Sequence, residues 1–352
     1  MSTTVLSVAY PFAPVGPDAV GGAEQVLTWL EMELAARSFQ SVVVARESSQ
    51  AAGQLLATAI PPGFITPETR DTVHAAHQAN INRALASDAV DLVHMHGIDF
   101  YRYSMPRDLP VLVTLHLPSS WYPQEIWNLP ANYHLQCVSE TQRRACPAEA
   151  QARLSVVENG VPLPPVSTHG STKGNFVLLL SRICPEKNLH AGLDAARLAG
   201  VPALLAGETF PYEEHLRYFK QEIEPRLGNH ARLLGPVGGA RKQELLAEAR
   251  CLLLPTLAPE TSSLTAMEAL AAGTPVIAYP SGAIPEIVEH GRTGFLVQGV
   301  EEMAAAMRQC DRIDPATCRA VAASRFPLTR MVEGYMALYS RLASSRNRAR
   351  HG

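Results

Sequence analysis

Two glutamates, Glu260 and Glu268, flank the neutral run TSSLTAM. This spacing permits two interpretations. In one, Glu268 completes a capping box with Thr265 and Glu260 is a solvated loop residue. In the other, the two carboxylates hold opposite ends of one ligand, whose middle rests on the backbone between them. Ser262 and Ser263 are favourable N-cap residues, and the helix start that they indicate offers unpaired N–H groups and a partial positive charge for an anion.

Two cations, Arg182 and Lys187, follow the apolar run at residues 176–181. At the carboxyl end of a strand, an arginine fork and a lysine point charge suit a diphosphate. Ordinary surface exposure of both side chains is the alternative. The chain has neither a Walker glycine-lysine loop nor a Gly-x-Gly-x-x-Gly motif. An ordinary ATPase or dehydrogenase is therefore not indicated.

Two further strand ends carry candidate ligand contacts. Gly21 and Gly22 stand between the long loop at residues 11–20 and a helical pattern, where a ligand could approach the backbone closely; a flexible turn is the alternative. His116 ends the apolar run that begins at residue 111. It could donate to a sugar hydroxyl or a phosphate, or it could find its partner within its own domain.

The pattern of metal-binding residue types argues against a metal site. His94 and His96 share one strand face, but no third ligand is evident from the spacing. No Cys-x-x-Cys pair occurs, which indicates reduced thiols and not a disulfide framework or zinc site. We therefore predict no metal and no cofactor. The six scattered cysteines are Cys137, Cys146, Cys184, Cys251, Cys310 and Cys318.

The elements that must position these residues alternate between apolar runs and helical patterns, which indicates an α/β protein with parallel sheets. Residues 160–175, rich in Pro, Ser, Thr and Gly, form the clearest linker. Each half is predicted to be a doubly wound domain, with the ligand in a cleft at the carboxyl ends of the strands. The predicted strands lie at 4–10, 41–45, 91–96, 111–116, 135–139 and 155–161, and then at 176–181, 202–208, 231–237, 251–256, 275–279 and 294–297.

The composition is that of a folded protein of two domains. A chain of 352 residues exceeds one ordinary core. Hydrophobic residues make up 47% and charged residues 18%, and the formal net charge of −3 does not favour nucleic acid as a partner. No signal peptide or membrane-spanning apolar stretch is evident, so we predict a cytoplasmic location. The basic end is expected to be frayed and solvated, with weak peripheral contact at an anionic inner membrane surface as the alternative; it contains Arg341, Arg346, Arg348 and Arg350.

The block from Glu260 through Glu268 to ALAAGTPVIAYPSGAIPEIVEHGRTGFLV resembles retaining nucleotide-sugar glycosyltransferases of family 4, which have the GT-B fold. The resemblance covers nearly the whole chain, through VGGAE, DLVHMHG, VLVTLH, CVSE, VVENGV, SRICPEKN, RLLGPV and RFPLTRMVEGYMALYSRL. It implies two Rossmann-like domains facing each other across a cleft. Residues 1–165 and a crossover helix at 328–352 would form the acceptor-side domain, and residues 166–327 the donor-binding domain.

The resemblance also implies a role for each candidate residue. Glu260 would hold hydroxyls of the transferred sugar, and Glu268 the ribose. Arg182 and Lys187 would neutralise the departing diphosphate. The family commonly has a bulky aromatic residue and a glycine at two positions of the phosphate cradle that are serines here, which leaves the donor sugar open. The remaining contacts would come from His116 near the transferred sugar, Val237 beside the base, and the amides of Gly21, Gly22, Ser262, Ser263 and Leu264 around the distal phosphate.

We therefore predict a retaining, metal-independent hexosyltransferase. Its donor would be a UDP- or GDP-sugar and its acceptor a hydroxyl of a glycan, lipid-linked sugar or small metabolite. A sugar-nucleotide epimerase, a glycan phosphorylase or a non-catalytic binder are the alternatives. A phosphorylase would require inorganic phosphate, and an epimerase would need no acceptor. Trp121, Tyr122 and Trp127 could stack on the acceptor, or they could pack in the core.

Overall fold

The computed structural model describes residues 3–37, 39–87, 89–164 and 173–351, without the side chains of residues 87 and 345–351. The chain forms two compact units. Met1–Glu158 and Thr329–Gly352 make the first, and Asn159–Leu328 the second. The division expected from the sequence places the first boundary a few residues later, at 165. Residues 165–172 of the predicted linker lie outside the described residues.

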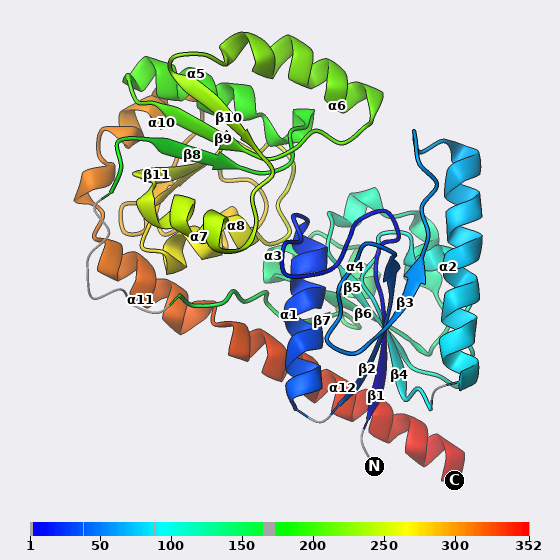
Figure 1. Ribbon diagram of the computed structural model, residues 1–352. Helices are drawn as coiled ribbons and strands as arrows, with labels where there is room; N and C mark the ends of the chain where they lie inside the picture. The colour runs from blue at the N-terminus through cyan, green and yellow to red at the C-terminus, as the bar shows by residue number, and fades with distance from the viewer. Residues whose placement is uncertain (1–2, 38, 88, 165–172, 352) are drawn as a thin grey trace. The chain divides into compact units, whose positions relative to one another are not determined.

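The first unit is built on a seven-stranded parallel sheet in the order β3-β2-β1-β4-β5-β6-β7 (Figure 1). Strands β1 and β5 are buried along their whole length, as expected for a parallel sheet covered on both faces. The strands are β1 (Thr4–Val8), β2 (Gln40–Arg46), β3 (Gln54–Thr58), β4 (Leu92–Met95), β5 (Val111–Leu115), β6 (Tyr133–Cys137) and β7 (Ser155–Val156). The helices are α1 (Gly22–Ala36), α2 (Pro67–Ser87), α3 (Glu140–Arg144), α4 (Ala148–Gln151) and α12 (Leu328–His351).

The second unit has a six-stranded parallel sheet in the order β10-β9-β8-β11-β12-β13. Helices α5 and α10 pack together on one face of it, and α7 and α8 lie on the other (Figure 1). The strands are β8 (Val177–Leu180), β9 (Ala203–Ala206), β10 (Ala231–Gly235), β11 (Cys251–Leu254), β12 (Val276–Ala278) and β13 (Gly294–Leu296). The helices are α5 (Leu189–Ala199), α6 (Glu213–Tyr218), α7 (Gly239–Glu248), α8 (Leu264–Ala271), α9 (Ile284–Ile287), α10 (Val300–Met307) and α11 (Pro315–Arg325).

In both sheets the strand order reverses beside the first strand of the unit, at β1/β4 and at β8/β11. At such a reversal the chain continues from the two strands to opposite faces of the sheet, and α/β proteins bind ligands in the crevice outside the carboxyl ends of these strands. In the second unit, the loop after β8 carries residues 181–188 and the loop after β11 carries residues 255–263. The predicted diphosphate cations and the stretch that contains Glu260 therefore lie at the same switch point.

Helix α12 belongs almost entirely to the first unit, where Tyr335 and Tyr339 are fully buried. The chain end, which we expected to be frayed, continues this helix to His351. The side chains of Arg346, Arg348 and Arg350 lie outside the described residues. Among the helices of the described residues, none combines the length and the apolar character needed to cross a membrane.

Candidate active site

The loops after β8 and β11 are joined by an ion pair between two candidate residues. Strands β8 and β11 are neighbours in the sheet, with Val177 opposite Cys251, so the loops at their carboxyl ends meet. Lys187 Nζ lies 2.5 Å from Glu260 Oε1, and both side chains are mostly buried. A hydrogen bond of 2.9 Å from the Leu257 amide to the Glu186 carbonyl ties the same two loops together. The strand order thus brings together two residues that are far apart in the sequence.

A left-handed residue fixes the turn that presents Lys187. Asn188 has φ 53, and among the described residues it is the one non-glycine with positive φ. Asparagine tolerates this region better than most residues. Its side-chain amide donates to the Pro255 carbonyl at 3.0 Å, which anchors the turn to the loop after β11. Asn188 therefore fixes the end of the short 3₁₀ turn Pro185–Lys187, directly before α5.

Arg182 is held less tightly than Lys187. Its guanidinium lies 5.6 Å from the centre of the Phe210 ring, and one nitrogen is 4.0 Å from a Glu186 carboxylate oxygen. Its side chain is 31% exposed, so its neighbours steady the cation while part of it still faces solvent. Both predicted diphosphate cations are thus partly buried at the switch point, and neither is an ordinary solvated surface residue.

Helix α8 begins differently from the capping-box interpretation. Ser263 is the N-cap, and its Oγ accepts a hydrogen bond from the Ala266 amide at 3.3 Å. The capping box of Thr265 with Glu268 is therefore wrong, because the helix already starts at Leu264. The Ser262 Oγ is buried and has no hydrogen-bond partner among the described residues. A buried hydroxyl without a partner, next to the positive end of a helix, suits an oxygen of an anionic ligand.

Glu268 pairs with a lysine that the sequence analysis did not select. Lys242 Nζ, from α7, lies 2.6 Å from Glu268 Oε1, and the side chains are 13% and 11% exposed. Burial raises the pKa of Glu268, and the nearby Lys242 ammonium opposes that rise. The sequence could have indicated Lys242, because a lysine in the first turn of a helix interacts unfavourably with the helix dipole. Its presence there suggests that it pairs with an acidic group. The two glutamates of the opening motif are thus each held by a lysine.

Replacing Glu268 by glutamine is expected to lower the free energy of unfolding by roughly 3 kcal/mol, because it removes the carboxylate facing the buried Lys242 ammonium. Replacing both residues, as Glu268→Gln with Lys242→Met, should recover much of this loss. Urea unfolding followed by far-UV circular dichroism measures the effect. Glu244→Gln breaks an exposed pair with Arg241 and should change stability little. Equal effects of Glu268→Gln and Glu244→Gln would contradict a structural role for the buried pair.

In the first unit, His116 is the outer member of a row of three imidazoles. His116 Nε2 lies 3.1 Å from His96 Nδ1, and His96 Nε2 lies 3.1 Å from His94 Nδ1. Burial lowers the pKa of His94 and His96 well below the usual value and that of His116 to about 3. All three rings are therefore neutral near pH 7, and each carries a single N–H.

The hydrogen bonds of Thr114 fix which nitrogen of His94 carries that proton. The Thr114 hydroxyl donates to Gln136 Oε1 at 2.8 Å, so it accepts from His94 Nε2, also at 2.8 Å. His94 Nδ1 is then an acceptor, and the Tyr339 hydroxyl at 2.7 Å and His96 Nε2 at 3.1 Å both face it. His116 Nε2 lies 3.1 Å from His96 Nδ1, so His116 has a partner within its own domain, which is the alternative that we left open for this residue.

His94 and His96, which the sequence suggested as a metal pair, belong to this hydrogen-bonded row. Both rings are committed to hydrogen bonds, and Tyr339 from α12 adds a contact of 2.7 Å to His94 Nδ1. In the part of the chain that the structure describes, one group of three side chains could hold a metal ion, and it lies in the second unit. Helix α12 is joined to the first sheet through this polar network.

The other predicted site residues are distributed over both units. Gly21 is the N-cap of α1 and Gly22 its first residue, so the glycine pair does stand at a helix N-terminus, in the first unit. Val237 is partly exposed in the loop between β10 and α7 of the second unit. Of the three aromatic residues considered for the acceptor, Tyr122 and Trp127 are each 7% exposed in the first core, as in the packing alternative, and Trp121 is 40% exposed.

Comparisons with known protein families match the chain in two stretches. Residues 20–164 match the family described as Glycosyltransferase Family 4, and residues 174–311 match Glycosyl transferases group 1. The D-inositol 3-phosphate glycosyltransferase of Mycolicibacterium smegmatis is 28% identical over 99% of this chain and 92% of its own length. The Streptomyces scabiei protein of the same name is 40% identical over 30% of this chain, and the match spans about a quarter of that relative (24%).

A solved structure shows the same fold. The structure of HepE from Anabaena in complex with UDP-glucose has a TM-score of 0.73 and 21% sequence identity, and covers 96% of this chain and 99% of its own. The chain therefore has the GT-B fold, with two parallel α/β units that each have their own switch point. Among proteins of this fold, this chain belongs to the glycosyltransferases of family 4, with a group 1 domain in its second unit.

Proposed function

We propose that this protein transfers a hexose from a nucleoside diphosphate sugar to a hydroxyl acceptor. The observation that carries the proposal is the switch point of the second unit. Two lysine-held glutamates, Glu260 and Glu268, flank the start of α8, and Arg182 stands on the neighbouring loop. The complex of HepE with UDP-glucose, a protein of the same fold, supports a donor of this class.

Departure of the diphosphate develops negative charge, which fixed positive groups stabilise without reorganisation. Lys187 and Arg182 supply two cations, and the N-terminus of α8 supplies a partial positive charge. The Ser262 hydroxyl, buried and without a partner among the described residues, would donate to a phosphate oxygen. Glu268 would accept hydrogen bonds from the ribose, and Glu260 from hydroxyls of the transferred sugar.

We propose that transfer retains the anomeric configuration without an enzyme nucleophile. Glu260 is the carboxylate assigned to the transferred sugar, and its ion pair with Lys187 at 2.5 Å makes it a weak nucleophile. The paired free carboxylates of retaining glycosidases have no counterpart in this assignment. The anomer of the product, read by proton NMR, tests the proposal; an inverted product would contradict it.

The acceptor is proposed to be a hydroxyl of a polyol, glycan or lipid headgroup. The Mycolicibacterium relative is named for D-inositol 3-phosphate, which makes inositol phosphates the first acceptors to test. Turnover of the donor without any acceptor would instead indicate an epimerase, and a requirement for inorganic phosphate a phosphorylase. Binding without turnover across the acceptor panel would favour a non-catalytic binder.

UDP or GDP is expected to bind the full chain with the same affinity in the presence and absence of a chelator, because cations of the protein already face the proposed diphosphate site. Isothermal titration calorimetry with UDP, GDP, ADP and CDP, each with and without EDTA, measures this and identifies the base. UMP and GMP are the matched controls, since they lack the second phosphate. Loss of binding in EDTA that magnesium restores would overturn metal independence.

A further inference from the structure

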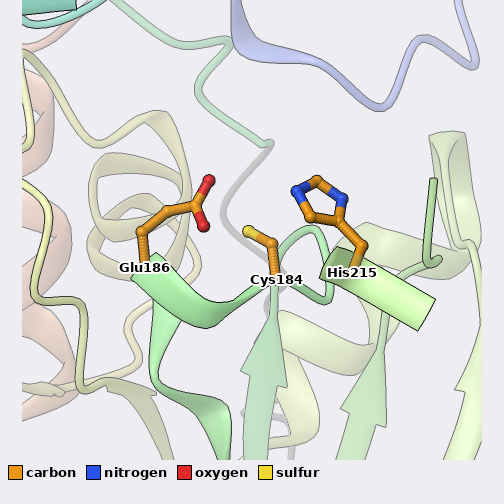
Figure 2. A group of neighbouring side chains, drawn as sticks. All are labelled: Cys184, Glu186 and His215. Atoms are coloured by element: carbon orange, nitrogen blue, oxygen red, sulfur yellow. The ribbon is translucent and has the colours of Figure 1, made fainter. Parts of the chain in front are cut away.

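Three side chains of metal-binding type converge beside the first loop of the second unit. The Sγ of Cys184, a carboxylate oxygen of Glu186 and a ring nitrogen of His215 lie within 4.8 Å of one another. Figure 2 shows the sulfur between the carboxylate and the imidazole. Cys184 is fully buried, His215 is 9% exposed and the Glu186 side chain is 29% exposed, so the group is mostly buried and solvent reaches it beside the carboxylate.

The fold explains why these residues meet. Cys184 and Glu186 belong to the turn after β8, where Cys184 is the N-cap of the 3₁₀ turn. His215 comes from α6, which follows the neighbouring strand β9. A hydrogen bond of 2.9 Å from the Ile183 amide to the Glu208 carbonyl joins the segments that leave the two strands. Cysteine spacing gave no sign of this group, because its imidazole comes from a different βα unit.

Within the group, the Cys184 thiol interacts with the Glu186 carboxylate, whereas the imidazole Nδ1 lacks a hydrogen-bond partner in the described part of the chain. His215 Nδ1 is buried and has no hydrogen-bond partner among the described residues. The Cys184 sulfur lies 3.8 Å from the Arg182 carbonyl, and Glu186 stands 4.0 Å from the Arg182 guanidinium. A buried imidazole nitrogen without a partner is costly, and it requires an explanation such as an ion or a water. A cation bound among the three side chains would supply one.

We propose that Cys184, Glu186 and His215 form a binding site for Zn²⁺, with a water molecule as the fourth ligand. Thiolate, imidazole and carboxylate are the ligands that zinc takes in proteins, whereas Mg²⁺ and Ca²⁺ prefer oxygen alone. Bonds of about 2.0–2.3 Å in a tetrahedron place ligand atoms about 3.5 Å apart, so the side chains must each close by about 1 Å or less. Binding releases the thiol proton to solvent and leaves a zinc–sulfur bond.

The proposed zinc site uses no side chain that we assign to sugar transfer, although it lies on the same loop as Arg182 and Lys187. Zinc would draw Glu186 away from Arg182, and would tie the turn that carries Lys187 to α6. The expected consequence is a stiffer loop after β8 and a more stable second unit in the presence of zinc. Donor binding does not require zinc in this proposal. A zinc site is therefore compatible with our expectation that a chelator leaves the nucleotide affinity unchanged.

Cobalt titration of the full chain tests this directly, because tetrahedral Co²⁺ bound to a thiolate has visible d–d bands and a near-ultraviolet sulfur-to-cobalt charge-transfer band. We expect both at one equivalent, with displacement by Zn²⁺. Cys184→Ser should abolish the charge-transfer band, and His215→Gln and Glu186→Gln should each weaken cobalt binding at least tenfold. Zinc should raise the melting temperature of the wild type but not of Cys184→Ser.

Two matched controls separate the site from adventitious binding. Cys318→Ser removes another buried cysteine of the second unit, and His230→Gln removes an exposed histidine of the same unit. Both should bind cobalt like the wild type. If Cys184→Ser fails to fold, the His215→Gln and Glu186→Gln titrations decide alone. A wild type without the charge-transfer band, or a band that survives all three site variants, would overturn the proposal.

Discussion

Replacing Lys187 by methionine is expected to slow sugar transfer by roughly 10²–10³-fold, the usual cost of removing one group that stabilises charge in a transition state. The lysine lies 2.5 Å from Glu260 on a turn locked by Asn188, so its ammonium is held in place before the reaction. Methionine keeps most of the length of the side chain and loses the charge. The measurement is kcat with the nucleotide sugar whose base binds in the calorimetric panel.

Two further variants test whether the loss of activity arises at the diphosphate. Lys220→Met removes an exposed lysine of the same unit and should leave transfer unchanged. Glu260→Gln should lower kcat strongly but leave the affinity for the free nucleoside diphosphate nearly intact, because that ligand has no sugar for Glu260 to hold. Lys187→Met should weaken that affinity as well. Equal affinity for free nucleotide in Lys187→Met and the wild type would contradict a role at the diphosphate.

The sequence predicted the sheets well where strands are buried on both faces. Runs such as VLVTL and VLLL are almost entirely apolar, and they correspond to β5 and β8. Strand β3 was not predicted, because it is an edge strand in which buried and exposed residues mix. Periodicity also left α12 unassigned to either half, since the pattern shows which face of a helix is buried and not what buries it.

Within the site, the sequence identified residue types but not their partners. Lys187 and Glu260 were both selected, yet their contact depends on β8 and β11 being neighbours, which is a property of strand order. The capping-box interpretation of Glu268 was wrong because the sequence offers both Ser263 and Thr265 as N-cap residues, and the helix begins after Ser263. The sequence also did not predict that Cys184 and His215 lie close together, because their contact depends on β8 and β9 being neighbours in the sheet.

The buried histidines of the first unit lower its stability in acid. Burial lowers the pKa of His77 to about 4 and the pKa values of His94 and His96 well below the ordinary 6.5. These rings stay neutral in the folded state, whereas in the unfolded chain they take up protons below about pH 6.5. The unfolded state then binds more protons, so stability falls as the pH decreases from about 6.5 towards 4.

Lowering the pH from about 7 to about 5 is therefore expected to cost about 2 kcal/mol for each imidazole that stays neutral. His77 has a pKa of about 4 in the folded state and should contribute about this much, and His94, His96 and His116 should add to the loss in the same direction. All three tryptophans of the chain, Trp29, Trp121 and Trp127, lie in the first unit. Urea unfolding followed by tryptophan fluorescence at a series of pH values thus reports this unit alone.

A matched pair of variants assigns the effect to the buried rings. His77 bonds to Thr58 Oγ1 at 2.8 Å and to the Ala9 carbonyl at 3.1 Å, and glutamine can replace one of these contacts without titrating. His77→Gln should be less stable than the wild type at pH 7 but should lose about 2 kcal/mol less between pH 7 and pH 5. His290→Gln, an exposed position in the second unit, should leave the tryptophan transition unchanged at every pH. A pH dependence of the same slope in His77→Gln and the wild type would show that His77 does not remain neutral in the folded first unit.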